Sequence, residues 1–506
     1  MTEAPPQVVV VGAGPTGVTA AILLGQRGIR TLVLDRWPEV FPQPRAVHLD
    51  DEVHRIVARL GLGAELAAIS RPGAGLRLLS AGHRCLAQFD RARPATANGF
   101  PQANMFDQPD LEVVLRRRMH ALDTVSFRGG VEVTRAAMTA GGGPVVAWTD
   151  RASGTTHEAR PAYVLGCDGA NSVVRAAIGG TMTDLGFPAQ RWLVVDVATD
   201  RDLGHWEGVH QVCDSRRAAT YMRIGATRYR WELELLDGET AADFASLDQI
   251  APLIAPWTTS TQGFELVRTA EYTFRAEISD RWRDRSIFLL GDAAHLTPPF
   301  IGQGMGAGIR DAANLAWKLA EVLDGRLPSS VLASYEDERI PHARAMIRLA
   351  QRVGRIMTGG GRLGDRVRDV VVPLTPRLPG FRRLVLDSTT PPLHASVLNQ
   401  RRRTTRTLAG TLCPNVELAP GRRFDDVVGG RFAVVVSGPP APSTLTRLEA
   451  RGIALVPADD VPELRDWLNT QRVALVRPDA TVMATGSSVR EVLGTIPSAG
   501  PSTTAT

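Results

Sequence analysis

The chain has 506 residues, of which 44% are hydrophobic and 22% charged, so two or three packed domains are expected and a disordered or low-complexity protein is excluded. The net charge of +5, from 58 basic and 53 acidic residues, is too small for this length to indicate a nucleic-acid partner. Four widely spaced cysteines without a CxxC pair argue against a disulfide framework or a metal site and favour a reducing cytoplasm.

The first 35 residues predict a strand, a glycine-rich turn, a helix and a second strand. Residues 7–11 are rich in valine, as expected of a strand buried in a parallel sheet, 18–26 have helical composition, and 29–34 return to strand composition. Glycines interrupt the apolar stretch 8–24 and no basic segment precedes it. We therefore expect no membrane span there.

The turn between the first strand and the helix fits the pattern G-x-G-x-x-G. Gly12 permits a tight turn, Gly14 lets backbone approach a pyrophosphate, and Gly17 lets the helix pack on the strand. Asp35 closes the second strand eighteen residues after Gly17, where a carboxylate can accept hydrogen bonds from a ribose. This turn predicts a dinucleotide site.

Two later strands, 163–166 and 287–290, each end in an acidic turn, at Asp168 and at Asp292. Both turns lead into helical sequence. Between them, from about 190 to 273, the pattern alternates and is aromatic, which predicts an antiparallel sheet with one covered face.

The two acidic turns carry a family resemblance. Cys-Asp-Gly-Ala-Asn-Ser at 167–172 with Arg175, and the segment 291–306, resemble the second and third signatures of class A flavin-dependent aromatic hydroxylases. Further segments are similar to the 3-(3-hydroxyphenyl)propionate hydroxylase branch of that family, namely 44–46, 50–52, the helix 111–119 opened by Gln108 and Pro109, 194–196 and 311–319. The resemblance covers nearly the whole chain.

The resemblance implies a cofactor, a reaction and a set of contacts. Non-covalent FAD would be reduced by NAD(P)H, a transient co-substrate, and would react with O₂ to a C4a-hydroperoxide that hydroxylates a phenolic or polycyclic aromatic ring. The substrate would be a small aromatic or polyketide-like molecule. The expected FAD contacts are Gly12, Gly14, Pro15, Thr16, Gly17, Asp35, Arg36, Arg45, Gln108, Asp168, Asp292, Pro299, Gly302, Gly304, Met305 and Gly306.

The implied fold is α/β with an α+β insert. We expect a Rossmann-like FAD-binding domain in two parts (1–185 and 276–398), an inserted antiparallel-sheet substrate domain (186–275), a C-terminal thioredoxin-like domain without CxxC (399–496) and a disordered tail (497–506). A homodimer is compatible with this organisation.

The catalytic residues are less well defined. His210, Tyr221 and Arg223 on the aromatic sheet, and Pro299 in the third signature, are the candidates, although packing within the sheet is the more common role of residues such as the first three. His295 is either an acid–base residue or a structural histidine of the turn.

The sequence bears on three alternative functions. A flavin-dependent halogenase needs a lysine near the flavin, and the only lysine, Lys318, lies well past the flavin loops. An FAD-dependent oxidase or dehydrogenase on the same fold stays open, as does a non-catalytic flavoprotein.

Overall fold

The computed structural model describes residues 4–42, 45–187, 190–359, 361–377, 390–401 and 407–498. Pro44 of the predicted Pro-Arg-Ala segment and nearly all of the predicted tail lie outside these residues.

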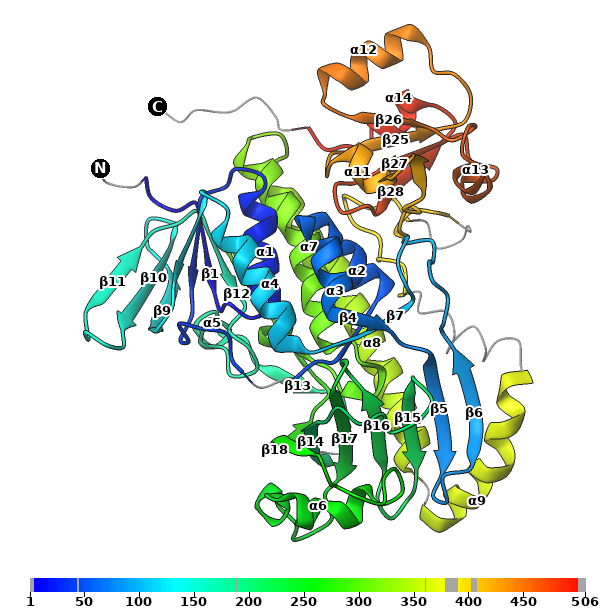
Figure 1. The fold of residues 1–506 in the computed structure, drawn as a ribbon. Coiled ribbons are helices and arrows are strands. Elements are labelled where there is room, and N and C mark those ends of the chain that lie inside the picture. Colours follow the sequence, from blue (N-terminus) through cyan, green and yellow to red (C-terminus); the bar gives the residue numbers. More distant parts are fainter. Residues whose placement is uncertain are drawn as a thin grey trace.

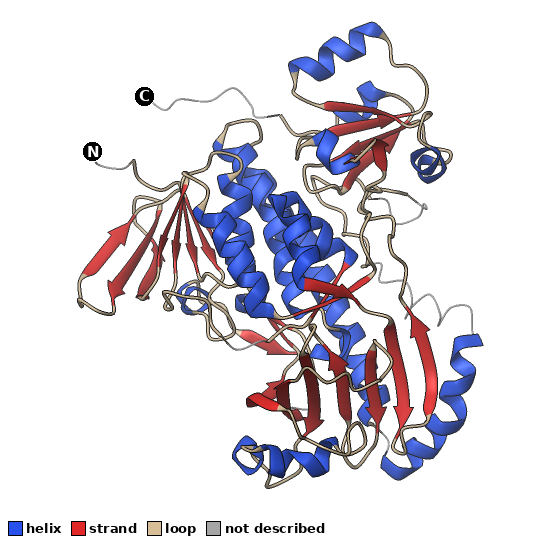
Figure 2. Ribbon diagram, in the orientation of Figure 1, coloured by secondary structure: helices blue, strands red, loops and turns tan. Residues whose placement is uncertain are grey.

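A six-stranded sheet forms the centre of the first fold region (Figures 1 and 2). Its order is β20 (Arg283–Asp284), β21 (Ile287–Leu289), β12 (Tyr163–Gly166), β1 (Val8–Val11), β2 (Thr31–Leu34) and β8 (Val125–Arg128). All neighbours are parallel except β20 and β21. The predicted strands near residues 8, 31, 163 and 287 are confirmed, and the buried valines of β1 account for its central place.

Helices cover one side of this sheet. They are α1 (Pro15–Gly25), α4 (Gln108–His120) and α7 (Gly304–Leu323), with α2 (Asp51–Val57), α3 (Gly63–Ile69) and α8 (Ser334–Thr358) next to them. Helix α1 begins three residues before the predicted position, because Pro15 fits the first helical turn. A three-stranded sheet of β9 (Val131–Met138), β10 (Pro144–Asp150) and β11 (Thr156–Ala159) contributes to the same core.

Two smaller three-stranded sheets and one short helix complete this region. One sheet has the order β3 (His48–Asp50), β7 (Ala103–Phe106) and β4 (Ser70–Pro72), and the other has the order β13 (Met182–Asp184), β19 (Glu277–Ser279) and β22 (His295–Leu296). The short helix is α5 (Val173–Ala177).

A seven-stranded sheet forms a second region of the fold, below the six-stranded sheet in Figure 1. Its order is β18 (Glu265–Phe274), β14 (Gln190–Ala198), β17 (Arg228–Glu234), β16 (Ala219–Arg223), β15 (Val209–Cys213), β5 (Gly75–Ser80) and β6 (Cys85–Asp90). The antiparallel strands predicted between 190 and 273 are present. Strands β5 and β6 lie outside the predicted range 186–275 and join through a parallel pairing of β5 with β15.

The two faces of the seven-stranded sheet have different neighbours. One face packs against α6 (Leu247–Ile254), which lies on the side away from the six-stranded sheet (Figure 1). The other face packs against α8 and Phe300, and helix α9 (Gly361–Val371) lies beside β5 and β6. Only side chains on the face that packs against α8 and Phe300 can therefore reach the third signature, at residues 291–306.

The C-terminal unit contains a four-stranded sheet in the order β26 (Ala454–Pro457), β25 (Ala433–Val436), β27 (Val473–Val476) and β28 (Val482–Gly486). Its helices are α11 (Phe424–Val428), α12 (Pro442–Ala450), α13 (Pro462–Leu468) and α14 (Val489–Leu493), and a short hairpin pairs β23 (Glu417–Ala419) with β24 (Arg422–Arg423).

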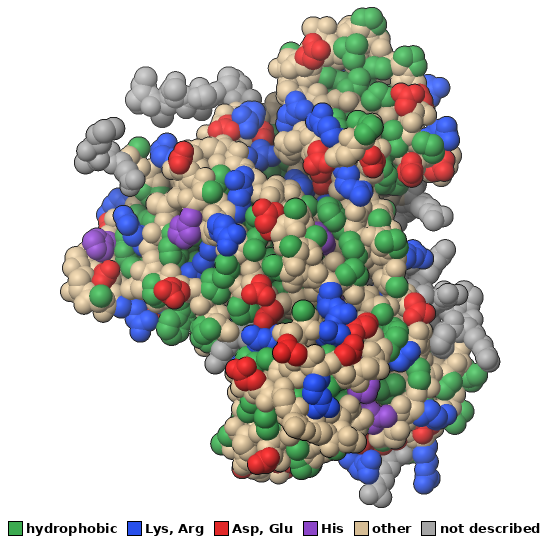
Figure 3. All heavy atoms as spheres, viewed as in Figure 1, with side chains coloured by type: hydrophobic (Ala, Val, Ile, Leu, Met, Phe, Trp, Pro, Cys, Tyr) green, Lys and Arg blue, Asp and Glu red, His purple; other side chains and the backbone are tan. Residues whose placement is uncertain are grey.

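Acidic and basic side chains are interspersed over the face shown in Figure 3, as the small net charge suggests. Within the described ranges, no helix combines the length and apolar character that crossing a bilayer requires.

Candidate FAD and substrate site

Three glycines after β1 form a cradle with room for a ligand. Gly12 has a φ of +103°, and a Cβ there would lie 2.3 Å from the Cys167 carbonyl oxygen. A Cβ on Gly17 would lie 1.9 Å from the Gly12 carbonyl oxygen, whereas a Cβ on Gly14 would meet nothing within 4 Å. The open space lies at the N-terminus of α1, which has no side-chain cap. Free N–H groups beside open space fit a pyrophosphate.

Asp35 holds this cradle from the end of β2. Its carboxylate accepts hydrogen bonds from the backbone N–H groups of Ala13 (2.5 Å) and Trp37 (2.7 Å). Further lone pairs remain on the carboxylate, so a ribose hydroxyl can also donate to it. Arg36, the next predicted contact, is exposed beside it.

Asp168 shapes the second turn. Its carboxylate accepts hydrogen bonds from Ser172 Oγ (2.5 Å) and from two backbone N–H groups at the start of α5 (2.7 and 3.1 Å). Burial raises the pKa of Asp168. Arg175 then donates to the Ala293 carbonyl (3.0 Å), which ties the second turn to the third.

Asp311 of α7 holds the third turn. It is fully buried and accepts hydrogen bonds from Gly291 N–H (3.0 Å), His295 Nε2 (2.9 Å) and Arg339 Nε (2.7 Å). Burial acts to raise the pKa of Asp311, but attraction to Arg339 and His295, together with the hydrogen bonds from His295 and Gly291, outweighs this effect, and the pKa is lowered. These contacts support the structural interpretation of His295. Asp292 lies on the same turn and is exposed.

The third signature ends at the N-terminus of α7. Pro299–Ile301 form a 3₁₀ turn that closes at Gly302, whose φ is +62°. A Cβ on Gly302 would lie 3.0 Å from His48 Nδ1, so the loop packs closely on β3. Helix α7 has no side-chain cap, and its first residues, Gly304–Gly306, therefore have N–H groups without helical acceptors. Such a helix N-terminus can stabilise the negative charge of a reduced flavin.

Gln108 anchors the segment that contains Arg45. Gln108 Oε1 accepts a hydrogen bond from Ala46 N–H (2.6 Å), and its Nε2 donates to Glu112 (2.7 Å). The side chain of Arg45 is exposed. Burial by the surrounding atoms raises the pKa of Asp292, and interaction with His295 and, to a smaller extent, with Arg45 partly offsets this rise. Arg45 and the third turn therefore border the same region.

Three of the four catalytic candidates lie on the α6 face of the seven-stranded sheet. The Tyr221 ring lies 5.9 Å from that of Trp257, within the apolar cluster that contains α6. His210 Nε2 lies 2.9 Å from the Trp206 carbonyl oxygen, and its ring lies 5.2 Å from that of Tyr221. Arg223 donates to Glu207 (3.1 Å). These are packing contacts, and a catalytic role for the three residues stays a prediction.

Pro299, the fourth candidate, lies across the sheet from these residues. Side chains alternate between faces along a strand, so Gln211 of β15 points opposite to His210. Its Nε2 donates to the carbonyl of Phe300, the neighbour of Pro299 (3.3 Å). The structure thus separates Pro299 from the other three candidates.

The face of the seven-stranded sheet that packs against α8 and Phe300 is called the second face. Sequence reasoning missed the polar residues on this face. Asp196 is fully buried on β14, and Arg230, directly opposite on β17, donates to it from Nε (2.6 Å) and NH2 (2.9 Å). Arg268, its partner on β18, lies 3.3 Å away. Arg230 also donates to the Arg45 carbonyl (2.7 Å). A charged residue within the otherwise apolar run 193–197 was the available signal, because a buried charge requires a partner.

Apolar side chains and a buried, unpaired acceptor also lie near this face. Met222 packs with Val47 and Met105. Gln211 Oε1 is buried and has no hydrogen-bond partner among the described residues. Burial lowers the pKa of His48 to about 4, so its ring is neutral near pH 7.

Comparisons with known proteins identify the family of the chain. The FAD binding domain family matches residues 6–350. The chain is 38% identical over 351 residues to a probable NADH-specific resorcinol 4-hydroxylase of Rhodococcus jostii, covering 69% of this chain and 65%, just under two thirds, of that protein. It is 35% identical to a 3-(3-hydroxy-phenyl)propionate/3-hydroxycinnamic acid hydroxylase of Burkholderia cenocepacia, covering 85% of this chain and 78% of that protein.

Solved structures show the same fold at lower identity. A ternary complex of aklavinone-11 hydroxylase with FAD and aklavinone has a TM-score of 0.81, 21% identity and 99% coverage of both chains. The flavin-dependent monooxygenase PieE, in complex with FAD and substrate, has a TM-score of 0.81, 20% identity and coverage of 98% of this chain and 99% of that one. The chain therefore belongs to the FAD binding domain family with FAD as its cofactor, and the predicted resemblance to flavin-dependent aromatic hydroxylases is confirmed.

Proposed function

We propose that the chain hydroxylates a phenolic or polycyclic aromatic substrate with NAD(P)H and O₂. The observation that carries this proposal is the convergence of three turns, after β1, β12 and β21, on the uncapped N-termini of α1 and α7. Bound FAD would accept a hydride from NAD(P)H and activate O₂, so that one oxygen atom can be transferred to the substrate. The protein supplies binding, orientation and exclusion of water.

The proposed FAD contacts follow the three turns. The open space at Gly14 would take the pyrophosphate, and Asp35 with Arg36 would meet the adenosine end. Asp292 would meet the ribityl chain, and the N–H groups of Gly304–Gly306 would face the flavin ring. The other proposed contacts are Gly12, Pro15, Thr16, Gly17, Arg45, Gln108, Asp168, Pro299 and Gly302.

The substrate is proposed to lie between the Pro299 loop and the second face of the seven-stranded sheet. The unpaired Gln211 Oε1 would accept a hydrogen bond from a phenol hydroxyl, because a buried acceptor without a partner costs about 1–3 kcal/mol. Met222 and Met105 would exclude water around the ring. The names of the relatives, a resorcinol hydroxylase and a hydroxyphenylpropionate hydroxylase, favour a phenol of one ring.

The C-terminal unit is proposed to be thioredoxin-like and structural. Its chain order is β25, α12, β26, α13, β27, β28, α14, with β25 and β26 parallel and the last two strands antiparallel, which supports this assignment. The one cysteine in 399–496 is Cys413. It is fully buried, and burial raises the pKa of its thiol, so thiol–disulfide exchange is not its role.

The test is substrate-dependent NAD(P)H oxidation under ¹⁸O₂ with a panel of phenols. A product heavier by one ¹⁸O atom, formed in step with NAD(P)H consumption, is the expected result. An oxidised product without ¹⁸O would assign the chain to the oxidases or dehydrogenases. FAD that is bound but never reduced by NAD(P)H with any phenol would favour a non-catalytic flavoprotein.

A further inference from the structure

A cavity of about 450 Å³ lies between the flavin-region helices and the C-terminal unit. Its floor comes from α2, α7 and α8, where Arg339 and His342 are buried. Its rim includes Arg93 and Ala97, which are exposed. The cavity shares no lining residue with the three FAD turns or with the second face of the seven-stranded sheet. It is therefore a separate chamber with an open rim.

Most charged groups in the lining already have partners. The ion pairs that involve residues of the lining include Arg55 with Asp425 (2.7 Å), Arg310 with Glu52 (2.8 Å), Arg339 with Asp311 (2.7 Å) and Asp479 with Arg477. Asp51 accepts hydrogen bonds from Thr96 Oγ1 and from Asn98 (2.9 Å). The partners of Asp51 are uncharged, so the charged residues of the lining outside these ion pairs are Asp51, Arg59 and Arg93.

The two remaining arginines are Arg59 and Arg93. Arg59 follows α2 and donates to the Pro478 carbonyl, and burial lowers its pKa. Neither arginine belongs to any ion pair found in the described part of the chain. A guanidinium that loses water without gaining a carboxylate costs free energy. An anion bound beside Arg59 would relieve that cost.

We propose that this cavity binds a small organic anion, with a carboxylate or phosphate head at Arg59 and Arg93. A guanidinium suits either head because its parallel N–H groups match two oxygens. The body of the ligand would lie against the apolar part of the lining, which includes Ile56, Ala313 and Leu393. The chamber thus presents positive charge together with an apolar wall.

Side chains on the floor of the cavity form hydrogen bonds with residues that hold the flavin turns. Arg310 NH1 donates to Gln303 Oε1 (2.9 Å), and Gln303 is the N-cap residue of α7. Arg339 donates to Asp311, which holds Gly291 of the third turn. A ligand on this floor would therefore be linked through Arg310 and Gln303, and through Arg339 and Asp311, to the turns proposed to position FAD.

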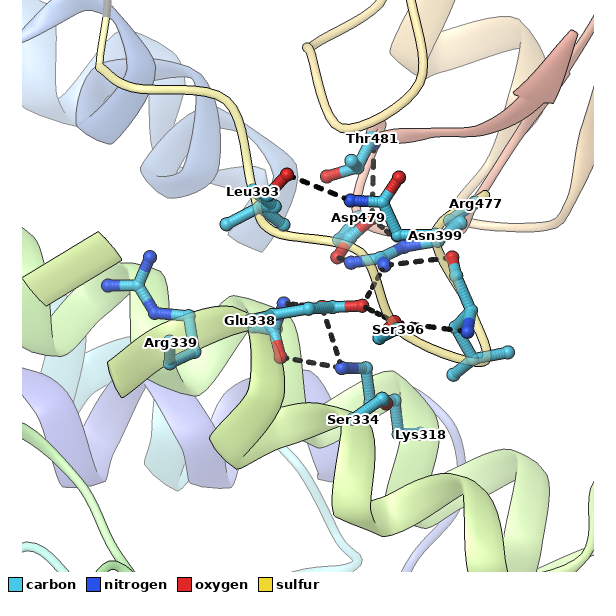
Figure 4. A network of polar contacts seen from close by, with 12 residues as sticks. Lys318, Ser334, Glu338, Arg339, Leu393, Ser396, Asn399, Arg477, Asp479 and Thr481 are labelled. Carbon is cyan, nitrogen blue, oxygen red and sulfur yellow. Dashed lines mark hydrogen bonds and ion pairs between the residues drawn. The ribbon is translucent and has the colours of Figure 1, made fainter. Parts of the chain in front are cut away.

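The roof of the cavity is part of a polar network. Leu393, Asp479 and Thr481 line the cavity, and Figure 4 shows them opposite Arg339. Thr481 N–H donates to Asp479 (3.1 Å), and the amide of Asn399 donates to the Leu393 carbonyl (3.0 Å). These bonds give the chamber a defined wall, and its shape comes from both the helices and the C-terminal unit.

The test is calorimetric titration of the full-length, FAD-loaded protein with benzoate and with phenyl phosphate. At least one probe should bind, and Arg59→Gln should weaken that binding about tenfold or more, whereas Arg59→Lys should retain most of it. Ala97→Trp should abolish binding by filling the rim without changing charge. Arg118→Gln is the matched control, because Arg118 also donates to a backbone carbonyl (Leu60, 3.0 Å) but lies outside the lining.

Two results would overturn the proposal. The first is failure of both probes to bind the wild-type protein. The second is binding that is unchanged in Arg59→Gln and Ala97→Trp and that perturbs flavin absorbance, which would place the probe in the substrate site. Neither measurement needs turnover, so the outcome is independent of whether the proposed hydroxylation is correct.

Discussion

At the scale of single residues, the glycine signature combines two different requirements. Gly17 is needed because a Cβ would meet the Gly12 carbonyl oxygen at 1.9 Å. Gly14 has ordinary backbone angles, with φ of −74°, and open space beside it. Gly17 is required for packing, whereas Gly14 leaves open space for the proposed pyrophosphate, although the sequence pattern treats the two glycines alike.

This difference predicts opposite outcomes for two alanine substitutions. Gly17→Ala should destabilise the protein itself by about 1–3 kcal/mol, because overpacking forces the backbone to shift. Gly14→Ala should leave the melting temperature of the FAD-free protein unchanged but weaken FAD binding about tenfold or more, because its methyl group would occupy the pyrophosphate space. Melting curves with and without FAD measure both effects. Equal FAD affinity in Gly14→Ala and wild type would place the pyrophosphate elsewhere.

Asp292 carries a second prediction for FAD binding. Its carboxylate is exposed on a turn whose backbone is held by Asp311, so the side chain can change without collapse of the turn. Asp292→Ala should weaken FAD binding about ten- to a hundredfold, the effect of losing a charge-assisted hydrogen bond. Fluorescence titration of FAD measures this. Asp248→Ala, an exposed aspartate on α6, is the control and should bind FAD normally.

Tyr221 and Gln211 test which face of the sheet meets the substrate. Burial raises the pKa of Tyr221, so it stays a neutral phenol near pH 7. Tyr221→Phe should change kcat by less than about twofold, since its ring packs on the α6 side. Gln211→Leu should raise the KM for a phenol about tenfold. Steady-state kinetics on both variants decide the matter, and loss of turnover in Tyr221→Phe would restore that residue as a catalytic candidate.

At the scale of elements, local patterns predicted strands and turns well but not their long-range partners. The strand 163–166 has the predicted bounds, because a short apolar run before an acidic turn is a local signal. The pairing of β5 with β15 joins segments more than a hundred residues apart, and no local pattern encodes it. The same limit hid which side of the sheet meets the proposed substrate, because alternation gives two faces without indicating what covers each.

Helix α8 shows how a buried element depends on charges from elsewhere. Glu338 is fully buried and accepts hydrogen bonds from Lys318 Nζ (2.9 Å), Asn314 Nδ2 (2.7 Å), Arg477 NH1 (2.7 Å) and Ser396 Oγ (2.6 Å) (Figure 4). Burial acts to raise the pKa of Glu338, but attraction to Arg477 and Lys318 outweighs it and the pKa is strongly lowered.

Glu338→Gln should therefore destabilise the protein by about 3–5 kcal/mol, because it leaves the buried Lys318 without a counter-charge and removes one of the two carboxylates paired with Arg477. Glu336→Gln on the same helix is the control and should cost about 1 kcal/mol or less, since its ion pair with Arg283 is partly exposed.

The lowered pKa of Glu338 also makes stability depend on pH. The ionised carboxylate contributes stability above pH 4.5, the ordinary pKa of a glutamate, and this contribution is lost as the pH falls towards the lowered pKa. Wild type should thus lose stability below about pH 4.5 more steeply than Glu338→Gln. Urea unfolding across pH 3–7 tests both statements, and identical slopes would contradict them.

At the scale of the whole molecule, the C-terminal unit shares its core with the helical layer. One apolar cluster joins Trp317, Leu327 and Val331 to Val434 and Leu475. Two buried ion pairs, Arg55 with Asp425 and Arg477 with Glu338, cross the same boundary. The C-terminal residues are thus part of the packing of α2, α7 and α8, the helices that position the flavin turns.

Truncation after Asn399 should consequently damage the flavin region and not merely remove an appendage. It would expose Trp317 and Val331, which are 3% and 0% accessible, and would leave Arg55 and Glu338 without partners from the C-terminal unit. Because unpaired buried charges and exposed apolar surface both disfavour the native state, we expect a lower melting temperature, reduced FAD content or a changed oligomeric state. Scanning calorimetry, flavin absorbance and size-exclusion chromatography measure the three. A truncated protein with wild-type values for all of them would show that the unit folds and acts independently.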